Sequence, residues 1–295
     1  MKQPIFKGSG VAIVTPFCDD NTIDFDAFGR LIDIQIKAGT KGIIVLGTTG
    51  EAATISDNEF NLIVDFAVKR VNGRIKVVVG VGKNCTAKSV FLSRQAAFFK
   101  ADALLVVTPY YNKTTQNGLI EHFKAIAAAT DLPIMLYNVP SRTGVSFEAQ
   151  TYRELSKLPS INGVKEASGN QGLVLKTRHL CPDDFYFYCG NDEETVSMMS
   201  MGAVGCVSVL GNIAPEKLKQ MCDFALVSDF KSALKIQIEM FDLIEGLFCE
   251  VNPIPVKAAL AKMGLMSENL RLPLIKMSEK NREKLFNSIK KHGLI

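Results

Sequence analysis

Eight short apolar segments recur along the chain and constrain its fold more than any other feature. Each is rich in Val, Ile or Leu, and most end in Gly, Pro, Ser or Thr, which is typical of strands buried in a parallel sheet. The segments cover residues 11–17, 42–48, 76–82, 103–109, 133–140, 162–168, 184–190 and 205–211. Their starts lie about 20 to 30 residues apart, so each gap can hold one helix and two loops.

Helical periodicity fills the gaps between these segments. Ser56 is followed three residues later by Glu59, which is the pattern of a capping box and predicts a helix over residues 56–71. Apolar side chains also follow a helical spacing over residues 26–38. Further helices are predicted over residues 86–100, 116–129, 146–157, 170–180 and 192–201. After about residue 212 the strand pattern ends, and residues 215–226, 229–250, 255–262 and 278–291 are predicted to be helical.

Eight strand–helix units predict an α/β fold, a TIM (β/α)8 barrel with a C-terminal helical appendage. A doubly wound open sheet is the alternative, but such a sheet usually has fewer strands and a Gly-rich first turn. The length of 295 residues exceeds the roughly 250 that a barrel needs. We therefore predict a catalytic barrel over residues 1–224 and a helical domain over residues 225–295.

Charge and motif content exclude several classes of function. The net charge of +4 is small and dispersed, so a nucleic-acid partner is not expected. The three histidines have no HExxH neighbour and the seven cysteines form no CxxC pair, which argues against a metal site and predicts reduced thiols. Neither a GxSxG elbow nor a GxGxxG turn after a strand is present, so serine-hydrolase and dinucleotide chemistry are not expected.

The sequence shows no signal for a membrane. No apolar stretch approaches the length of about 18 residues that crosses a bilayer, and the first ten residues lack the apolar core of a signal peptide. We expect a cytoplasmic enzyme without a membrane partner. Its chemistry should use Lys, Tyr, Thr or carboxylates rather than a metal or a bound cofactor.

Lys165 is the strongest anomaly among the predicted strands. A lysine inside a central strand is costly unless it points into a polar mouth, and TIM-barrel active sites lie where the strands end. Lys165 could instead pair with Glu166 or Asp192, or face outward. Burial lowers the pKa of a lysine in general, and a free amine in a pocket adds to ketones to form a Schiff base.

Other strand ends offer groups that suit such chemistry. Tyr137 can move protons at the nitrogen and at a new C–C bond, unless it is only a core aromatic. Thr48 and Thr49 can hold a carboxylate, although simple helix capping would also explain them. Arg142 offers a fork for a second carboxylate, although a lone Arg is more often a surface cation. From the residues alone we predict a class I lyase or aldolase that acts on an anionic keto acid.

Several motifs carry a resemblance to a known family. Residues 8–17 read GSGVAIVTPF, residues 252–257 read NPIPVK and residues 270–274 read LRLPL. Together with the strand-end residues, they make the whole chain resemble the 4-hydroxy-tetrahydrodipicolinate synthase (dihydrodipicolinate synthase) family. That family belongs to the pyruvate-dependent aldolase superfamily, which also includes N-acetylneuraminate lyase.

The resemblance implies covalent chemistry on Lys165. This lysine would form an imine with pyruvate, so neither a cofactor nor a metal is needed. Tyr137 would donate and accept protons, joined by Thr48 and Tyr111 in a relay of hydroxyl groups. In this family the tyrosine at the position of Tyr111 comes from the neighbouring subunit. The resemblance therefore implies a homo-oligomer, either a dimer or a tetramer built as a dimer of dimers.

The resemblance also assigns the binding of two small anions. Thr49 would bind the carboxylate of pyruvate, Val207 would face the bound pyruvate, and Gly190 would be a further substrate-binding position. Arg142 would bind the carboxylate of L-aspartate 4-semialdehyde. Attack of the enamine on the aldehyde, followed by cyclisation, would give hydroxytetrahydrodipicolinate for diaminopimelate and lysine biosynthesis.

Two other functions stay open as alternatives. A lyase for N-acetylneuraminate or 2-keto-3-deoxy sugar acids would share the imine chemistry, but it would need hydroxyl-binding groups rather than the cation Arg142. A non-enzymatic protein that binds small molecules on a barrel scaffold would require Lys165 to be unreactive.

The chain departs from lysine-sensitive members of the family at the region that binds the inhibitor. In those members the position of Lys88 is an acid that pairs with the amino group of lysine, and the positions of Asp57 and Phe60 usually include His. Like charges brought together can cost several kcal/mol, so we predict weak or absent inhibition by lysine. The region comprises Ala52, Ala53, Asp57, Phe60, Asn84, Lys88 and Tyr110.

Overall fold

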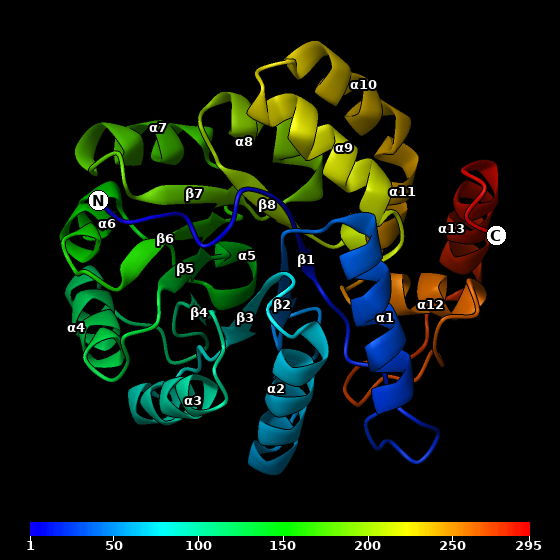
Figure 1. Ribbon diagram of the computed structural model, residues 1–295, viewed down its shortest axis with the longest axis horizontal. Helices are drawn as coiled ribbons and strands as arrows, with labels where there is room; N and C mark the ends of the chain where they lie inside the picture. Colours follow the sequence, from blue (N-terminus) through cyan, green and yellow to red (C-terminus); the bar gives the residue numbers. More distant parts are fainter.

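The computed structural model describes residues 1–295 and shows a closed barrel of eight parallel strands surrounded by helices (Figure 1). Each strand pairs with the next one along the chain, and the first pairs with the last to close the barrel. The strands are β1 (Gly8–Ala12), β2 (Gly42–Val45), β3 (Lys76–Gly80), β4 (Ala103–Val107), β5 (Ile134–Asn138), β6 (Ile161–Glu166), β7 (Tyr186–Cys189) and β8 (Gly205–Ser208). The predicted TIM barrel is confirmed.

The first strand lies earlier than the sequence pattern predicts. The expected segment was 11–17, whereas β1 spans Gly8–Ala12 and pairs with β8 from Gly8 onward. A Cβ atom at Gly10 would come within 2.6 Å of the Phe6 ring and 2.8 Å of the Cys206 carbonyl oxygen, so this position has no room for a side chain. Glycines that make room for close packing carry no apolar signal, and this is why the prediction began too late.

The barrel helices follow the predicted cadence. They are α1 (Phe25–Ala38), α2 (Asp57–Val71), α3 (Thr86–Phe98), α4 (Gln116–Ala127), α6 (Ala149–Ser156), α7 (Gln171–Leu180) and α8 (Thr195–Ser200). The capping box at the start of α2 is confirmed, because the Ser56 hydroxyl accepts from the Glu59 N–H and the Glu59 carboxylate accepts from the Ser56 N–H. Two short helices that the pattern missed lie in the loops after β5 and β8, namely α5 (Pro140–Thr143) and η2 (Leu210–Asn212). The helix predicted over residues 192–201 begins as a short 3-10 turn, η1 (Asp192–Glu194), and continues as α8.

The C-terminal part of the chain is helical, as predicted, but with one more break. It contains α9 (Pro215–Leu226), α10 (Phe230–Glu239), α11 (Phe241–Phe248), α12 (Ile254–Lys262) and α13 (Glu279–Lys291). The single helix expected over residues 229–250 is wrong, because the chain turns at Met240 between α10 and α11 without a Gly or Pro to signal it. α9 packs on β1 and α1, and α13 packs on α11 and α12 (Figure 1). The domain boundary at 224/225 stays a prediction; it falls within the last turn of α9.

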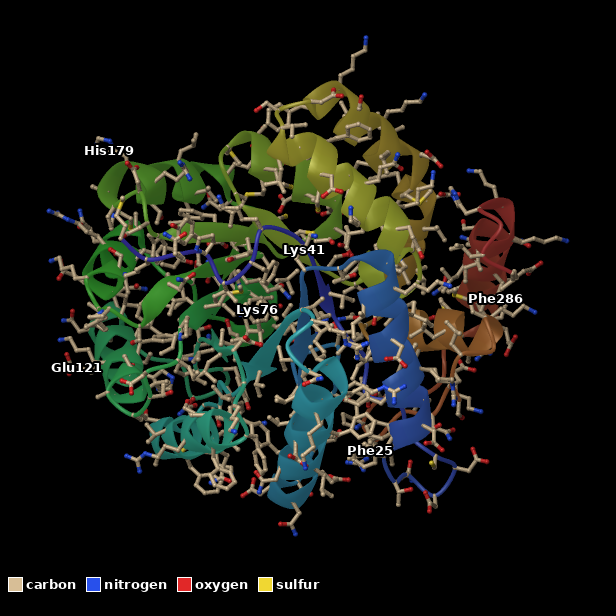
Figure 2. All side chains as sticks on the ribbon, in the orientation of Figure 1. Phe25, Lys41, Lys76, Glu121, His179 and Phe286 are labelled. Carbon is tan, nitrogen blue, oxygen red and sulfur yellow. The ribbon has the colours of Figure 1, made fainter.

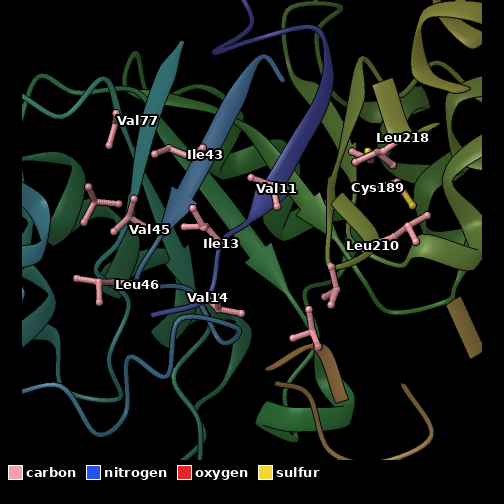
Figure 3. Close-up of a cluster of buried hydrophobic side chains, with 14 of the residues drawn as sticks. Val11, Ile13, Val14, Ile43, Val45, Leu46, Val77, Cys189, Leu210 and Leu218 are labelled. Carbon is pink, nitrogen blue, oxygen red and sulfur yellow. The ribbon is translucent and has the colours of Figure 1, made fainter. Parts of the chain in front are cut away.

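Two apolar layers fill the molecule because side chains alternate along each strand. The outer layer lies between the strands and the helices and includes Val11 and Ile43 from the strands and Leu218 from α9 (Figure 3). The inward-facing layer fills the barrel and includes Ile44, Met135, Tyr137, Tyr188 and Val207.

The two ends of the barrel differ in their role. Lys41 and Lys76 lie near the middle of the view in Figure 2, at the N-terminal ends of β2 and β3. Active sites of TIM barrels lie at the opposite, C-terminal end. No helix in the structure combines the length and the apolar character that crossing a bilayer requires.

Candidate active site

Lys165 points into the barrel, toward the residue that faces it on the neighbouring strand. Lys165 on β6 is in register with Tyr137 on β5. The Lys165 ammonium lies 4.4 Å from the centre of the Tyr137 ring, and the two residues are each 6% exposed. The structure thus brings together the amine and the phenol that the sequence proposed as partners.

The two carboxylates that could have neutralised Lys165 are bound elsewhere. Glu166 faces the outer layer, where it accepts hydrogen bonds from the Tyr152 hydroxyl at 2.8 Å and from the Asn138 amide at 3.0 Å. Burial raises the pKa of Glu166. Since successive residues of a strand point to opposite faces, the outward direction of Glu166 is what places Lys165 inside.

Asp192 holds the chain at the end of the neighbouring strand instead. One of its carboxylate oxygens accepts from the Val209 and Leu210 N–H groups at 2.9 Å each, and the other, Oδ1, is buried without a hydrogen-bond partner. Burial raises the pKa of Asp192, and the positive charge of Lys165 opposes that rise. In the structure, therefore, Lys165 forms no ion pair with either Glu166 or Asp192.

Gly190 lies against the lysine, and Val207 lies in the apolar layer that fills the barrel. A Cβ atom at Gly190 would come within 3.0 Å of Lys165 Cε and 2.7 Å of the Ala167 Cβ, so the glycine leaves the space that the lysine occupies. Val207 is 1% exposed and belongs to the same inner layer as Tyr137.

Thr48 and Thr49 lie in the loop that follows β2. Simple helix capping does not explain them, because α2 begins only at Asp57 and is capped by Ser56. Thr49 is buried, and its hydroxyl accepts a hydrogen bond from the Asn252 amide at 3.0 Å. The Thr49 proton is therefore left to donate to another group.

A cavity of about 320 Å³ opens at this end of the barrel. Thr48, Tyr137 and Arg142 line it, while Lys165 and Thr49 are buried beside it. The exposed Arg142 guanidinium forms no ion pair with a carboxylate, and one of its N–H groups donates to the Asn252 carbonyl at 3.4 Å. The cavity thus combines a phenol, a hydroxyl and a free cation above a buried amine.

Tyr111 is the one predicted catalytic residue that the single chain does not bring to the site. It is 91% exposed and has a positive φ of 69°, whereas its neighbour Tyr110 lines the cavity. Sequence reasoning in turn missed Asn252, whose side chain contacts Thr49 and whose carbonyl contacts Arg142. The signal was present, because Asn252 opens the NPIPVK motif, but nothing local to that motif says which loop it touches.

The region that resembles a lysine-binding site is split between two cavities. Ala52, Asp57, Phe60, Asn84 and Lys88 line a smaller cavity beside the first, whereas Ala53 and Tyr110 line the larger one. Lys88 forms an ion pair with Asp57 inside the smaller cavity.

Comparisons with known proteins agree with this geometry. The model of the dihydrodipicolinate synthetase family matches residues 5–292. A 4-hydroxy-tetrahydrodipicolinate synthase from Alkaliphilus oremlandii is 49% identical over 99% of this chain and 100% of its own length. The crystal structure of dihydrodipicolinate synthase from Aquifex aeolicus is similar with a TM-score of 0.96, at 42% identity over 98% of this chain and 99% of that one. A monomeric dihydrodipicolinate synthase variant is also similar, with a TM-score of 0.96 at 40% identity over 99% of this chain and 98% of that one.

Proposed function

The chain belongs to the dihydrodipicolinate synthetase family, and on that premise we propose that it condenses pyruvate with L-aspartate 4-semialdehyde through an imine on Lys165. It is a lyase of diaminopimelate and lysine biosynthesis. The observation that carries the residue assignment is the buried Lys165 ammonium, which faces the Tyr137 ring and has no carboxylate partner.

The first step joins pyruvate to the enzyme. The unprotonated Lys165 amine attacks the C2 carbonyl of pyruvate, and loss of water leaves the imine. Tyr137 hands a proton to the departing oxygen and recovers it through Thr48 and the Tyr111 of a neighbouring subunit. When a proton leaves the methyl group of the adduct, the iminium nitrogen accepts the electron pair. The product is the enamine, and the covalent adduct itself acts as the electron sink.

The second step forms the carbon–carbon bond. The enamine carbon attacks the aldehyde of the semialdehyde, and the resulting oxyanion takes a proton from the relay. Attack of the semialdehyde amino group on the imine carbon closes the ring and releases Lys165 as a free amine. The net products are hydroxytetrahydrodipicolinate and one water, and no cofactor or metal enters the balance.

Two separate groups suit the two carboxylates. The Thr49 hydroxyl accepts from Asn252, which leaves its proton to donate to the pyruvate carboxylate. Arg142 forms no ion pair within the chain and offers a fork to the carboxylate of the semialdehyde. Gly190 and Val207 form the wall against which the small keto acid fits.

The same premise implies an oligomer with shared sites. Tyr111 is exposed on one chain, which agrees with a role in the relay of a neighbouring subunit. We propose a homodimer as the minimal active unit, with a tetramer as a dimer of dimers. We also propose a cytoplasmic location, because a reducing compartment suits seven free cysteines, two of which, Cys206 and Cys222, have sulfur atoms only 3.5 Å apart.

A trapping experiment and a rate assay test the proposal together. Borohydride in the presence of pyruvate should add a reduced adduct to the Lys165 peptide and to no other lysine, and Lys165→Ala should abolish both the adduct and the condensation. Loss of condensation with the adduct mapped elsewhere would refute the role of Lys165. Efficient cleavage of N-acetylneuraminate or a 2-keto-3-deoxy sugar acid, with no condensation of the semialdehyde, would favour the alternative lyase.

A further inference from the structure

Two polar side chains on the outer face of the barrel lie next to the reactive pair along the same two strands. On β5, Asn138 follows Tyr137. On β6, Glu166 follows Lys165, and the strands pair so that Asn138 is opposite Glu166. The Asn138 amide donates to the Glu166 carboxylate, at 3.0 Å to Oε1 and 3.2 Å to Oε2. Since successive residues of a strand point to opposite faces, this outer pair, Asn138 and Glu166, accompanies the inner pair on the other side of the sheet.

The pairing of β5 with β6 is irregular at its start, before it reaches the active site. The ladder skips Asn162 of β6, which lies between the partners of Ile134 and Met135. A shift of one residue between neighbouring strands turns every side chain to the opposite face. In a shifted register Lys165 would face the helices instead of the barrel interior. Contacts beyond the irregularity must therefore select the register that the chemistry needs.

Glu166 is held in place by donors from separate segments of the chain. The Tyr152 hydroxyl on α6 donates to Oε2 at 2.8 Å, and the Ser168 N–H after β6 donates to Oε1 at 2.9 Å. Both donors are neutral, as is the Asn138 amide. Burial raises the pKa of Glu166, and these hydrogen bonds oppose the rise. A buried carboxylate is costly unless its hydrogen bonds are made, so displacement of this group would be unfavourable.

Asn138 is fixed at both of its polar atoms as well. It is fully buried, its Oδ1 accepts from the Phe147 N–H at 3.4 Å, and its amide also donates to the Ser146 hydroxyl at 3.2 Å. Its backbone carbonyl accepts the Ala167 N–H at 2.9 Å, which continues the pairing of the two strands to their ends. Any other register would leave buried polar groups of the outer pair without partners.

We propose that Asn138 and Glu166 are positioning residues for imine formation. Their contact fixes the register of β5 and β6 at the active-site end and so keeps the Lys165 amine facing the Tyr137 ring. Both act through the residue that precedes them on the strand. A misplacement of about 1 Å can lower a rate about 100-fold, so the contact should matter for the reaction as well as for stability. The inference rests on the proposed function, because it concerns the attack of Lys165 on pyruvate.

Exchanging the two groups in the full-length protein tests the inference. Asn138→Asp brings two carboxylates into contact, Glu166→Gln brings two amides into contact, and the double variant restores one carboxylate and one amide. Imine formation at saturating pyruvate is followed by borohydride quenching at timed intervals, below the Tm of every variant. We expect imine formation to slow by about tenfold or more in each single variant. The double variant should recover to within about threefold of the wild type, because the two positions act as a pair.

A control variant separates positioning from stability. Leu285 is buried on α13, away from the two strands, and Leu285→Ala should lower the free energy of unfolding without slowing imine formation. Wild-type rates in both single variants would overturn the inference, as would a double variant no faster than the slower single variant. Equal slowing in Leu285→Ala would also overturn it. No adduct on Lys165 in the wild type would refute the proposed function as well, which distinguishes the two failures.

A second pair of variants serves if two buried carboxylates prevent folding. Tyr152→Phe removes one donor to Glu166. Tyr186→Phe removes a hydroxyl that donates at the same distance, 2.8 Å, to the Lys2 carbonyl near the start of β7, at the opposite end of the barrel. We expect imine formation to slow about threefold or more in Tyr152→Phe and to stay at the wild-type rate in Tyr186→Phe. Equal rates in these two variants would overturn the inference.

Discussion

The Glu51 carboxylate and the Lys257 ammonium form an ion pair that is closed off from solvent, with 2.5 Å between Oε1 and Nζ and side-chain exposures of 1% and 0%. The second carboxylate oxygen of Glu51 accepts a hydrogen bond from the backbone N–H of Arg271 at 3.2 Å, and the Lys257 ammonium lies 4.2 Å from the centre of the Phe17 ring. Burial lowers the pKa of Lys257 to about 8, with Glu51 opposing the fall. This ion pair links α12, which contains Lys257, to the loop that contains Thr48, Thr49 and Glu51.

Breaking the buried pair should destabilise the fold strongly. Lys257→Met leaves Glu51 charged and buried without its partner, a change that costs about 3–5 kcal/mol. Urea unfolding at neutral pH measures the free energy of unfolding. The matched control is Lys217→Met, which breaks the half-exposed pair between Lys217 and Glu239 and should cost at most about 1 kcal/mol. Similar losses of unfolding free energy in the two variants would show that the buried pair contributes no more to stability than the half-exposed one.

Removing the Arg142 cation should affect one substrate and not the other. We expect Arg142→Gln to lower kcat/KM for the semialdehyde by roughly 10- to 100-fold, because a hydrogen bond to a charged group is lost. Trapping of pyruvate on Lys165 by borohydride should stay at the wild-type rate, since Arg142 is assigned to the second carboxylate. Steady-state kinetics and the trapping rate measure the two effects. A parallel loss of trapping would mean that Arg142 acts on pyruvate or on the loop as a whole.

Shared active sites should make two inactive variants complement each other. In a mixed dimer of Lys165→Ala and Tyr111→Phe chains, one site has both defects and the other has neither. Random exchange in a 1:1 mixture should therefore restore about one quarter of the wild-type activity, as a two-fold symmetric interface requires. Rate assays before and after subunit exchange test this. If Tyr111 served its own chain, every mixed site would carry one defect and no activity would return.

His122 should make the fold sensitive to mild acid. It lies on α4 with Nδ1 2.9 Å from the Thr86 hydroxyl, while Nε2 is buried without a partner, and burial lowers its pKa from 6.5 to about 4. In the unfolded chain His122 therefore takes up a proton near pH 6.5, whereas in the folded chain it takes up the proton only near pH 4. The contribution of His122 to stability is full above pH 6.5 and is lost as the pH falls through this window.

Replacing this histidine should reduce that loss. We expect the free energy of unfolding of His122→Gln, measured in urea at pH 7 and pH 5, to change less between the two pH values than that of the wild type. His179→Gln, which alters an exposed histidine, is the control and should follow the wild type. Equal pH dependence in all three proteins would contradict a buried neutral His122.

Free lysine should inhibit the enzyme weakly or not at all. The cavity that corresponds to the inhibitor site of lysine-sensitive relatives contains Lys83 and Lys88, and its one acid, Asp57, is already paired. The amino group of a lysine ligand would meet like charges there. Initial rates with lysine up to the millimolar range should stay near the uninhibited value. Clear inhibition at sub-millimolar lysine would refute this prediction.

Local sequence patterns predicted the architecture and supplied the candidates for the reactive groups. Eight apolar segments at helix-sized intervals predict a barrel, because the covering helices and the parallel strands must alternate. A lysine inside the sixth strand makes Lys165 the candidate for the reactive amine, because a charge inside a central strand is costly unless it points into the polar mouth of the barrel. Where the signal was weak the prediction failed, as at β1, whose glycines pack closely but look like a loop, and at the break between α10 and α11.

Only the tertiary structure decided which partners those groups have. Glu166 and Asp192 were both open to Lys165 in the sequence, but the strand direction turns Glu166 outward and the end of β8 occupies Asp192. Asn252 meets Thr49 across 203 positions of the chain, a contact that depends on how the C-terminal helices pack on the barrel. Periodicity and motifs depend on near neighbours in the sequence, whereas charge balance depends on neighbours in space. That is why the partners of Glu166, Asp192 and Asn252 became visible only after the fold had placed these residues.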